Sequence, residues 1–390
     1  MVSSRLPGNL ELNAVARAIA DKRRRGTACV DLTESNPTRA GFTYPDDLLL
    51  PLGHPRGLDY EPQALGLWSA RAAVAADFRR RGIVISADRV AITSSTSEAY
   101  ALLFKLLCDA GDNVLVPHPS YPLFEHLTQF ESVQAVPYGL EYHGSWRIDI
   151  ESVRRAATDR TRAVLIVSPN NPTGSFLHRE DLDAVSRLAA EHQWAVIGDE
   201  VFADYAIDPA PGATHVLASP SVLTFSLGGL SKSAGLPQVK LGWIGCGGPE
   251  ADVDRALAAY EIIADTYLSA STPVQGAAAE LIEKGSAIRA QILERVRRNL
   301  GALRTIAAGF PAVDVLRVEG GWTAVIKVPQ LRTEEELVLE LIEHDDVIVH
   351  PGYFFDFPSE AFVVVSLLVE PGPFKTAVTK VLTRAVGGAR

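Results

Sequence analysis

The chain has little of several features that would fix its class at once. Its 390 residues include only three cysteines, Cys29, Cys108 and Cys246, which lie far apart and match no metal-binding or disulfide spacing. We expect them to be buried, reduced thiols of an intracellular protein. No hydrophobic run approaches the roughly 20 apolar residues that cross a membrane. The N-terminus has no apolar stretch ahead of its basic cluster, so we expect no secretory signal and a cytoplasmic location.

Positive charge is also scarce. The sequence has 37 Lys and Arg against 47 Asp and Glu, which gives a net charge of −10. Such a chain has no surplus to neutralise phosphates, so we expect neither nucleic acid nor a membrane as a partner. A hydrophobic content of 47% over this length can bury a large core. At about 150 residues per domain, the length predicts two or three domains.

Short apolar runs alternate with segments of helical periodicity over most of the chain. Residues 163–167 are apolar at every position, as in a strand buried on both faces. Similar strand candidates are found at residues 90–93, 113–116, 194–197, 222–225 and 241–244. Strands that alternate with helices predict an α/β fold with a mostly parallel sheet and helices on both sides.

The pattern changes after residue 269. Residues 275–306 predict a long helix with a break near Gly285, and short strands mixed with helices follow. We therefore expect a large α/β domain over 45–285 and a smaller α+β C-terminal domain over 286–390. The N-terminal segment, 1–44, is expected to pack with the smaller domain.

Three polar side chains follow consecutive buried strands. Asn171, Asp199 and Lys232 are separated by 28 and 33 residues, each about one βαβ unit. Singly, they are consistent with a turn, a helix cap and a surface lysine. Together they predict a ligand crevice, because open α/β sheets bind ligands at the carboxyl ends of their strands. A lysine in the small-residue loop that follows a buried strand can form a Schiff base with a carbonyl-bearing cofactor.

A second candidate site is an anion site at residues 94–96. Ser94, Ser95 and Thr96 follow an apolar strand and open a helix, so their N–H groups and hydroxyls converge where an anion is favoured. The same residues are also consistent with a simple helix N-cap.

In order and spacing, these motifs resemble the class I/II aminotransferases, which are aspartate-aminotransferase-like, fold-type I pyridoxal 5′-phosphate enzymes. The resemblance runs from about residue 31 to about residue 368. It implies that Lys232 forms the Schiff base with the cofactor and later carries the proton between the substrate Cα and the cofactor. It also implies that Asp199 pairs with the pyridinium nitrogen, and that Asn171 donates to the cofactor's 3′ oxygen.

The resemblance extends to the rest of the cofactor site. It implies a phosphate cup made by Ser94, Ser95, Thr96, Ser231 and Lys240. Tyr121 matches the aromatic residue that stacks on the pyridine ring. Tyr60 matches the tyrosine that reaches the phosphate of the neighbouring subunit, which implies a homodimer with shared active sites.

Three positions depart from the family pattern. Lys240 stands where the family usually has an arginine, so the bidentate contact with phosphate is lost. Phe202 replaces a tyrosine that donates to the 3′ oxygen, which predicts a raised Schiff-base pKa unless Tyr205 compensates. Val364 replaces the arginine that usually holds the substrate α-carboxylate, and a valine cannot bind that group.

Two residues are candidates for the missing substrate contact. Arg39 lies in the segment 34–41, which in the family covers the substrate, and an arginine there can pair with a carboxylate. His350 is a second and weaker candidate. A solvated surface arginine and a loop histidine without a substrate role are the alternatives.

The resemblance implies transamination, in two half-reactions, between an amino acid donor and a 2-oxo acid acceptor. The same apparatus also supports β-elimination of the carbon–sulfur lyase kind and other carbanion chemistry, including cyclisation. A further alternative is a protein of this fold that binds the cofactor without turnover. A plain α/β binding module without the cofactor is the remaining alternative.

Overall fold

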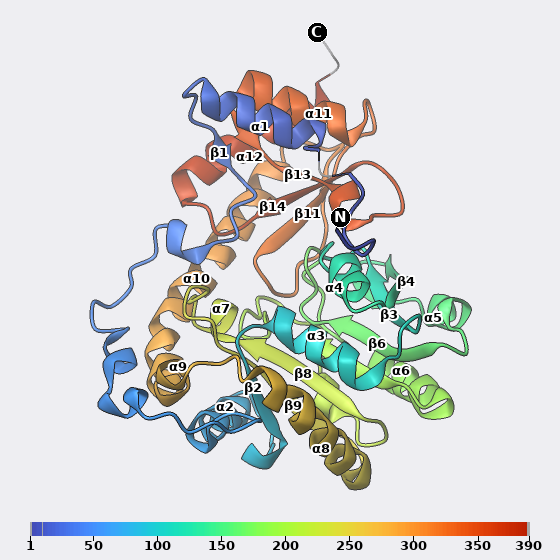
Figure 1. Ribbon diagram of the computed structural model, residues 1–390. Helices are drawn as coiled ribbons and strands as arrows, with labels where there is room; N and C mark the ends of the chain where they lie inside the picture. The colour runs from blue at the N-terminus through green and yellow to red at the C-terminus, as the bar shows by residue number, and fades with distance from the viewer. Residues whose placement is uncertain (1, 10, 388–390) are drawn as a thin grey trace.

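A computed structural model describes residues 2–9 and 11–387. Its centre is an eight-stranded, mostly parallel sheet (Figure 1) in which β9 runs antiparallel to β2 and β8, and β5 antiparallel to β4. The predicted mostly parallel sheet is therefore confirmed. In spatial order the strands are β2 (Val90–Thr93), β9 (Gly242–Gly247), β8 (Thr224–Gly229), β7 (Ala195–Asp199), β6 (Thr161–Val167), β3 (Asn113–His118), β4 (Gln134–Tyr142) and β5 (Trp146–Ile148).

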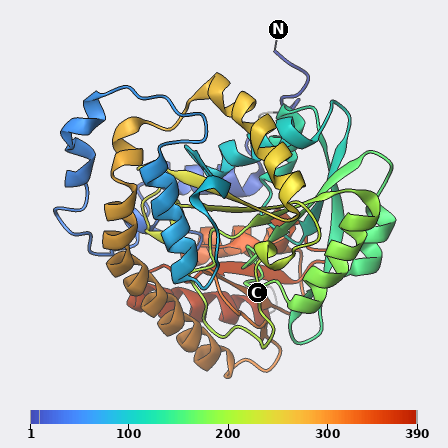
Figure 2. The same ribbon diagram turned by 90° about the horizontal axis from the view of Figure 1, so that it is seen from below.

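Helices cover both faces of this sheet, as Figure 2 shows from below. Successive strand residues point to opposite faces, so Leu165 packs with one group of helices and Val164 and Ile166 with another. The first group is α3 (Thr96–Leu107), α4 (Phe124–Phe130) and α8 (Glu250–Tyr267). The second group is α5 (Ile150–Ala156) and α6 (Arg179–His192), and α2 (Trp68–Arg80) packs beside β2. The sheet is buried on both sides, which explains the continuous apolar runs.

A second, antiparallel sheet lies above the first in Figure 1. Its strands are β10 (Asp314–Val315), β11 (Thr323–Lys327), β14 (Phe362–Ser366) and β13 (His350–Pro351). Two helices, α11 (Glu334–Glu340) and α12 (Pro371–Val386), pack with it. The N-terminal α1 (Ala14–Arg24) contacts α11, and β1 (Val30–Asp31) pairs in parallel with β12 (Val347–Ile348). The N-terminal segment thus packs with the C-terminal part, although the domain boundaries at residues 44 and 285 remain a prediction.

One long helix connects the two parts. After α9 (Thr272–Gly276) the chain turns at Ala277, and α10 (Ala278–Ala307) then runs without interruption. The break expected near Gly285 is therefore wrong. A Cβ on Gly285 would lie 2.4 Å from the Ala234 Cβ, so the glycine serves close packing of α10 on the segment after β8. No helix in the described ranges is both long and apolar enough to span a bilayer.

Candidate active site

The carboxyl ends of β6, β7 and β8 carry the three polar residues that the sequence singles out. Asp199 is the last residue of β7 and pairs in register with Val167 of β6 and Leu227 of β8. Asn171 lies in the loop after β6, and Lys232 lies in the one-turn helix α7 (Leu230–Ser233) after β8. Parallel strands therefore bring the three segments to one edge of the sheet, the place where such sheets bind ligands.

Lys232 lies in a poorly solvated, aromatic environment. Its Nζ is 5.4 Å from the centre of the Phe202 ring and 4.9 Å from that of Trp322. Burial lowers the pKa of the Lys232 amine, and the negative charge of Asp199 opposes this shift. A lysine that loses its proton more readily is more often neutral, and only the neutral amine can act as a nucleophile or accept a proton. Trp322 was not singled out from the sequence, because Gly-Gly-Trp carries no recognisable chemical signal.

Asp199 is held by a residue that the sequence did not identify. The Tyr100 hydroxyl, from α3, donates to Asp199 Oδ2 at 2.8 Å, and the Val201 N–H donates to Oδ1 at 3.3 Å. Burial raises the pKa of the Asp199 carboxyl, and the Tyr100 hydrogen bond lowers it. Asp199 forms no ion pair within the described ranges. A carboxylate at this depth is stabilised when a cationic partner binds beside it.

The side-chain oxygen of Asn171 also lacks a partner among the described residues. This Oδ1 is buried and makes no hydrogen bond to any residue that the structure describes. The preceding Asn170 is fully engaged, because its Nδ2 donates to the Pro119 carbonyl at 3.0 Å and its Oδ1 accepts from the Ser120 hydroxyl at 3.0 Å. These bonds join the Asn171 loop to the loop that carries Tyr121, whose side chain remains 47% exposed. An unpaired amide and an exposed aromatic ring suit a planar polar ligand.

The anion site at the start of α3 is partly occupied by a side chain of the same helix. The Glu98 carboxylate accepts from the Ser94 N–H at 2.6 Å and from its hydroxyl at 3.0 Å, while the Ser95 hydroxyl accepts from the Glu98 N–H. Ser95 is thus a helix N-cap, as the alternative reading allowed. The N–H groups of Thr96 and the next residue, at the first turn, remain available to an anion.

Two further segments of the expected cup are brought close to this helix. A Cβ on Gly242 would lie 2.8 Å from the Ser95 carbonyl carbon, so the chain directly after Lys240 touches the start of α3. Lys240 itself is exposed and adopts a left-handed backbone, with φ of +60°. Ser231 lies in α7, next to Lys232. Tyr60 is 77% exposed on the single chain.

The expected substrate side of the site has a different character. Val364 of β14 is 1% exposed and packs in an apolar cluster with Trp146 and Phe355. His350 faces Val364 across the antiparallel β13–β14 pair, so the two side chains share one face of the small sheet. Burial lowers the pKa of the His350 imidazole, opposed by Asp31. The His350 imidazole beside Val364 therefore favours its neutral form.

Arg39 lies in a 3₁₀ turn close to the end of β14. The Ser366 hydroxyl donates to the Glu34 carbonyl at 2.6 Å and its N–H to the Leu32 carbonyl, which fixes the segment before Arg39 against the strand that carries Val364. The Arg39 side chain is exposed and makes no ion pair within the described ranges. It is thus an exposed cation five residues after Glu34, whose carbonyl Ser366 holds.

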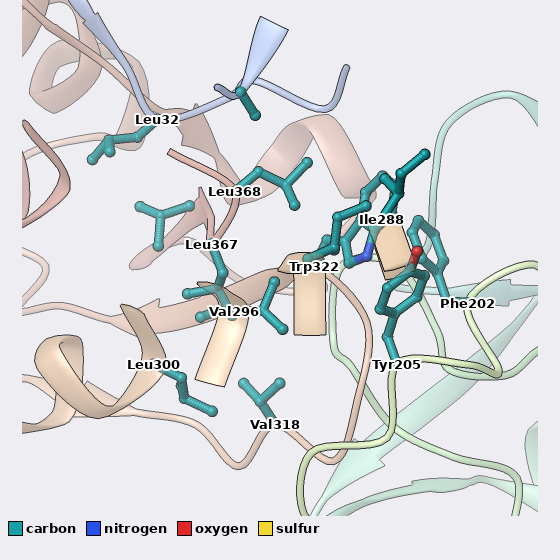
Figure 3. Packing of buried hydrophobic residues seen from close by; sticks show 14 of the residues in the cluster. Leu32, Phe202, Tyr205, Ile288, Val296, Leu300, Val318, Trp322, Leu367 and Leu368 are labelled. Carbon is teal, nitrogen blue, oxygen red and sulfur yellow. The ribbon is translucent and has the colours of Figure 1, made fainter. Parts of the chain in front are cut away.

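Tyr205 does not supply the donor that Phe202 lacks. Its side chain is 0% exposed, and its hydroxyl donates to the backbone carbonyl of Lys232 at 2.5 Å. Figure 3 shows Phe202, Tyr205 and Trp322 packed together beside Ile288 of α10. The hydroxyl is committed to the backbone of the lysine segment, so the proposed compensation has no support in the structure.

The fold and the strand-end lysine together define an α/β enzyme with a lysine at the ligand edge of its sheet. A family model for aminotransferase class I and II matches residues 62–369. The glutamate-pyruvate aminotransferase AlaA of Escherichia coli K12 is 26% identical over 88% of this chain and 87% of its own length. An alanine aminotransferase of Mycobacterium bovis is 27% identical over 86% of this chain and 80% of its own length.

Solved structures agree on the fold. A crystal structure of an aminotransferase from Escherichia coli superimposes with a TM-score of 0.87 at 24% identity, covering 100% of this chain and 99% of the other. The chain therefore belongs to the class I and II aminotransferases, and the resemblance inferred from its motifs is confirmed. It is an enzyme that transfers an amino group.

Proposed function

We propose that the chain is a pyridoxal 5′-phosphate-dependent aminotransferase that works through Lys232. The observation that carries the proposal is the pair at the ends of β7 and β8. A lysine whose pKa is lowered by burial lies within electrostatic reach of a carboxylate that has no ion-pair partner in the described chain. The unpaired Asn171 amide and the exposed Tyr121 ring fit the same flat, polar cofactor.

Each residue near Lys232 would have a separate role. When bound, the cofactor supplies an electron sink for the negative charge that develops at the substrate Cα. Lys232, whose amine is more easily neutral, would hold the cofactor and would accept the proton from the substrate Cα. Asp199 would pair with the protonated ring nitrogen, with Tyr100 favouring the ionised carboxylate. Asn171 and Tyr121 would bind the polar edge and the flat face of the cofactor.

Phosphate binding is assigned to the region where α3 begins. The first-turn N–H groups at Thr96, together with Ser94, Ser95 and Ser231, would contact the phosphate oxygens. Lys240 would supply the positive charge, without the fork of an arginine. Glu98 lies in the same place, so part of the local hydrogen-bonding capacity is already used.

The substrates would be an amino acid and a 2-oxo acid, with Arg39 holding the carboxylate. The relatives named above are glutamate-pyruvate and alanine aminotransferases, which supports small amino acids as the first donors to test. Arg39 is supported by its free charge and by its tie to the β14 end. His350 would contact the substrate as a neutral group, because burial lowers its pKa.

A homodimer would complete the site. Tyr60 is largely exposed on the single chain, as expected if it reaches the phosphate of a neighbouring subunit. The same segment exposes Leu50 and Leu58, by 73% and 89%. Exposed apolar side chains that follow one another in a segment are typical of a surface covered by a partner.

The test is an absorbance spectrum between about 300 and 500 nm, recorded on protein loaded with pyridoxal phosphate before and after amino acids are added. We expect a band from the Lys232-linked cofactor that shifts to shorter wavelength with a suitable donor. Loss of the band in Lys232→Ala would assign it. A chain that binds no cofactor, or a band that never responds to any of the amino acids, would contradict transamination.

β-Elimination remains a second candidate because Val364 leaves the usual carboxylate contact unfilled. It is distinguished by its products. Pyruvate and ammonia released from cysteine-like substrates without a 2-oxo acid acceptor would favour elimination, whereas strict dependence on an acceptor would favour transamination.

A further inference from the structure

Only a few backbone hydrogen bonds within the segment that carries Lys232 hold its conformation. α7 is a single turn, from Leu230 to Ser233, and one turn fixes several backbone dihedrals for very few hydrogen bonds. The carbonyls at the end of a helix have no partners within it. The orientation of Lys232 therefore depends on what the rest of the protein donates to these carbonyls.

Side chains from three distant segments donate to backbone carbonyls at the end of α7 and directly after it. The Tyr205 hydroxyl donates to the Lys232 carbonyl at 2.5 Å, and Arg289 Nη1 of α10 donates to the Ser233 carbonyl at 2.9 Å. The Tyr44 hydroxyl, from the N-terminal part, donates to the Gly235 carbonyl at 2.7 Å. We call these three donors, Tyr44, Tyr205 and Arg289, the lysine clamp.

Ion pairs hold the lysine clamp in place. Asp204, next to Tyr205, accepts from Arg80 of α2 at 2.6 Å and lies 3.6 Å from Arg289. Arg80 is held in turn by Asp77 at 2.8 Å. Two clamp donors thus share Asp204 as an anchor, and Gly285 lets α10 approach the segment closely enough for Arg289 to reach it.

We propose that Tyr205 is a positioning residue that sets the orientation of Lys232 through the backbone. Its buried side chain directs its hydroxyl at the backbone carbonyl of the lysine itself. In Tyr205→Phe the Lys232 carbonyl would keep the longer bond from the Gly235 N–H, at 3.2 Å, and loss of the hydroxyl bond would loosen the turn that holds Lys232. The inference rests on the proposed role of Lys232, but its first readout does not need the cofactor.

The structure offers a matched control. Tyr138 is also buried, and its hydroxyl also donates to a backbone carbonyl, that of Leu165, at 2.8 Å. Tyr138 lies in β4, on the face of the large sheet that packs with α6. Tyr205→Phe and Tyr138→Phe therefore remove the same kind of bond and differ in whether the carbonyl belongs to Lys232.

The first experiment is hydrogen–deuterium exchange on the cofactor-free chain. The N–H groups of Ala234, Gly235 and Leu236 close the turn around Lys232, by bonds to the Leu230 and Lys232 carbonyls. In Tyr205→Phe we expect these amides to exchange about fivefold to tenfold faster than in the wild type. In Tyr138→Phe we expect them unchanged. Equal exchange in Tyr205→Phe and wild type, or equal acceleration in both variants, would overturn the proposal.

The second experiment measures the lysine directly. Wild type and both variants are mixed with pyridoxal phosphate, quenched with borohydride at intervals, and analysed for the adduct on Lys232. We expect about fivefold slower adduct formation in Tyr205→Phe only, with Arg289→Lys closer to wild type than Arg289→Gln. The proposal is overturned if Tyr205→Phe reacts as fast as wild type. Absence of any adduct in the wild type would instead contradict the proposed function, and the exchange result would still stand.

Discussion

The two sides of the site around Lys232 are built on different principles. On the sheet side, polar groups follow the ends of successive strands, and their pKa values are shifted by burial and by one another, as for Lys232 and Asp199. On the small-sheet side, the position of the usual cation is filled by Val364, which is packed among aromatic rings. The available cation, Arg39, is exposed and comes from a different segment.

The difference separates chemistry from recognition. Proton transfer and charge stabilisation need groups held at fixed positions, which strand ends and a clamped backbone provide. Substrate recognition needs only a complementary group within reach, and it can come from a loop without changing the reaction. We infer that this chain retains the family reaction and meets the carboxylate of its substrate differently.

The largest effect is expected for Lys232→Ala. The variant loses both the covalent attachment point and the base, so exchange of the substrate α-proton should fall by at least about 10³-fold. The measurement is loss of α-deuterium by NMR, in the presence of pyridoxal phosphate. Lys375→Ala, on the exposed face of α12, serves as the control and should exchange normally. Retention of more than about a tenth of the wild-type rate would remove Lys232 from the chemistry.

The second prediction concerns the missing arginine. Val364→Arg should not restore a family-like site, because the position is surrounded by Trp146, Phe355 and other apolar groups. An unpaired charge buried there should lower the free energy of unfolding by about 3–5 kcal/mol. Urea unfolding of Val364→Arg and of Val364→Ile measures this, and the isoleucine variant, which adds one methylene to the packed cluster, should lose only about 1 kcal/mol. A stable arginine variant with a lower KM would mean that the small-sheet side can bind the substrate carboxylate through an arginine at position 364, as in the family pattern.

A smaller effect is expected for Arg39→Ala. If the guanidinium holds the substrate carboxylate, the loss of one charge-assisted hydrogen-bonded pair should raise KM by about tenfold or more and leave kcat nearly unchanged. Arg79→Ala provides an exposed arginine on α2 as the control. Steady-state kinetics with the donor found in the spectral assay decides the matter. Unchanged kinetics in Arg39→Ala would exclude this contact.

The strand-end residues could be predicted from the sequence because they obey a local rule. A buried apolar run followed by a polar residue fixes both the strand and the edge at which it ends, and this held for Asn171, Asp199 and Lys232. The fold class followed from the same pattern. The helix break near Gly285 failed because a glycine within a helix also serves close packing, here against Ala234, which periodicity does not reveal.

The supporting residues could not be predicted in this way. Tyr100 reaches Asp199 from 99 residues away, and Tyr205 and Arg289 meet the Lys232 segment from separate elements. Neither a tyrosine in a loop nor an arginine in a long helix signals such a partner in the sequence, so only tertiary packing reveals the hydrogen bonds. Glu98 shows the same limit in the anion site, where an ordinary helix-capping residue takes up the donors of Ser94.

The smallest effect is expected at Phe202, a residue on the sheet side that departs from the family pattern. The centre of the Phe202 ring lies 5.4 Å from the Lys232 amine nitrogen. In the family pattern, a tyrosine at this position donates to the 3′ oxygen of the cofactor. That donor favours the deprotonated linkage between Lys232 and the cofactor, so its absence predicts a raised pKa, and a spectral titration of the wild type should show no midpoint well below 7. Phe202→Tyr should lower the midpoint by about one pH unit, which corresponds to about 1.4 kcal/mol. Phe202→Leu, which adds no donor, should not lower it. A wild-type midpoint well below 7 would show that another group already supplies the hydrogen bond, and the sheet side would then be complete despite the phenylalanine.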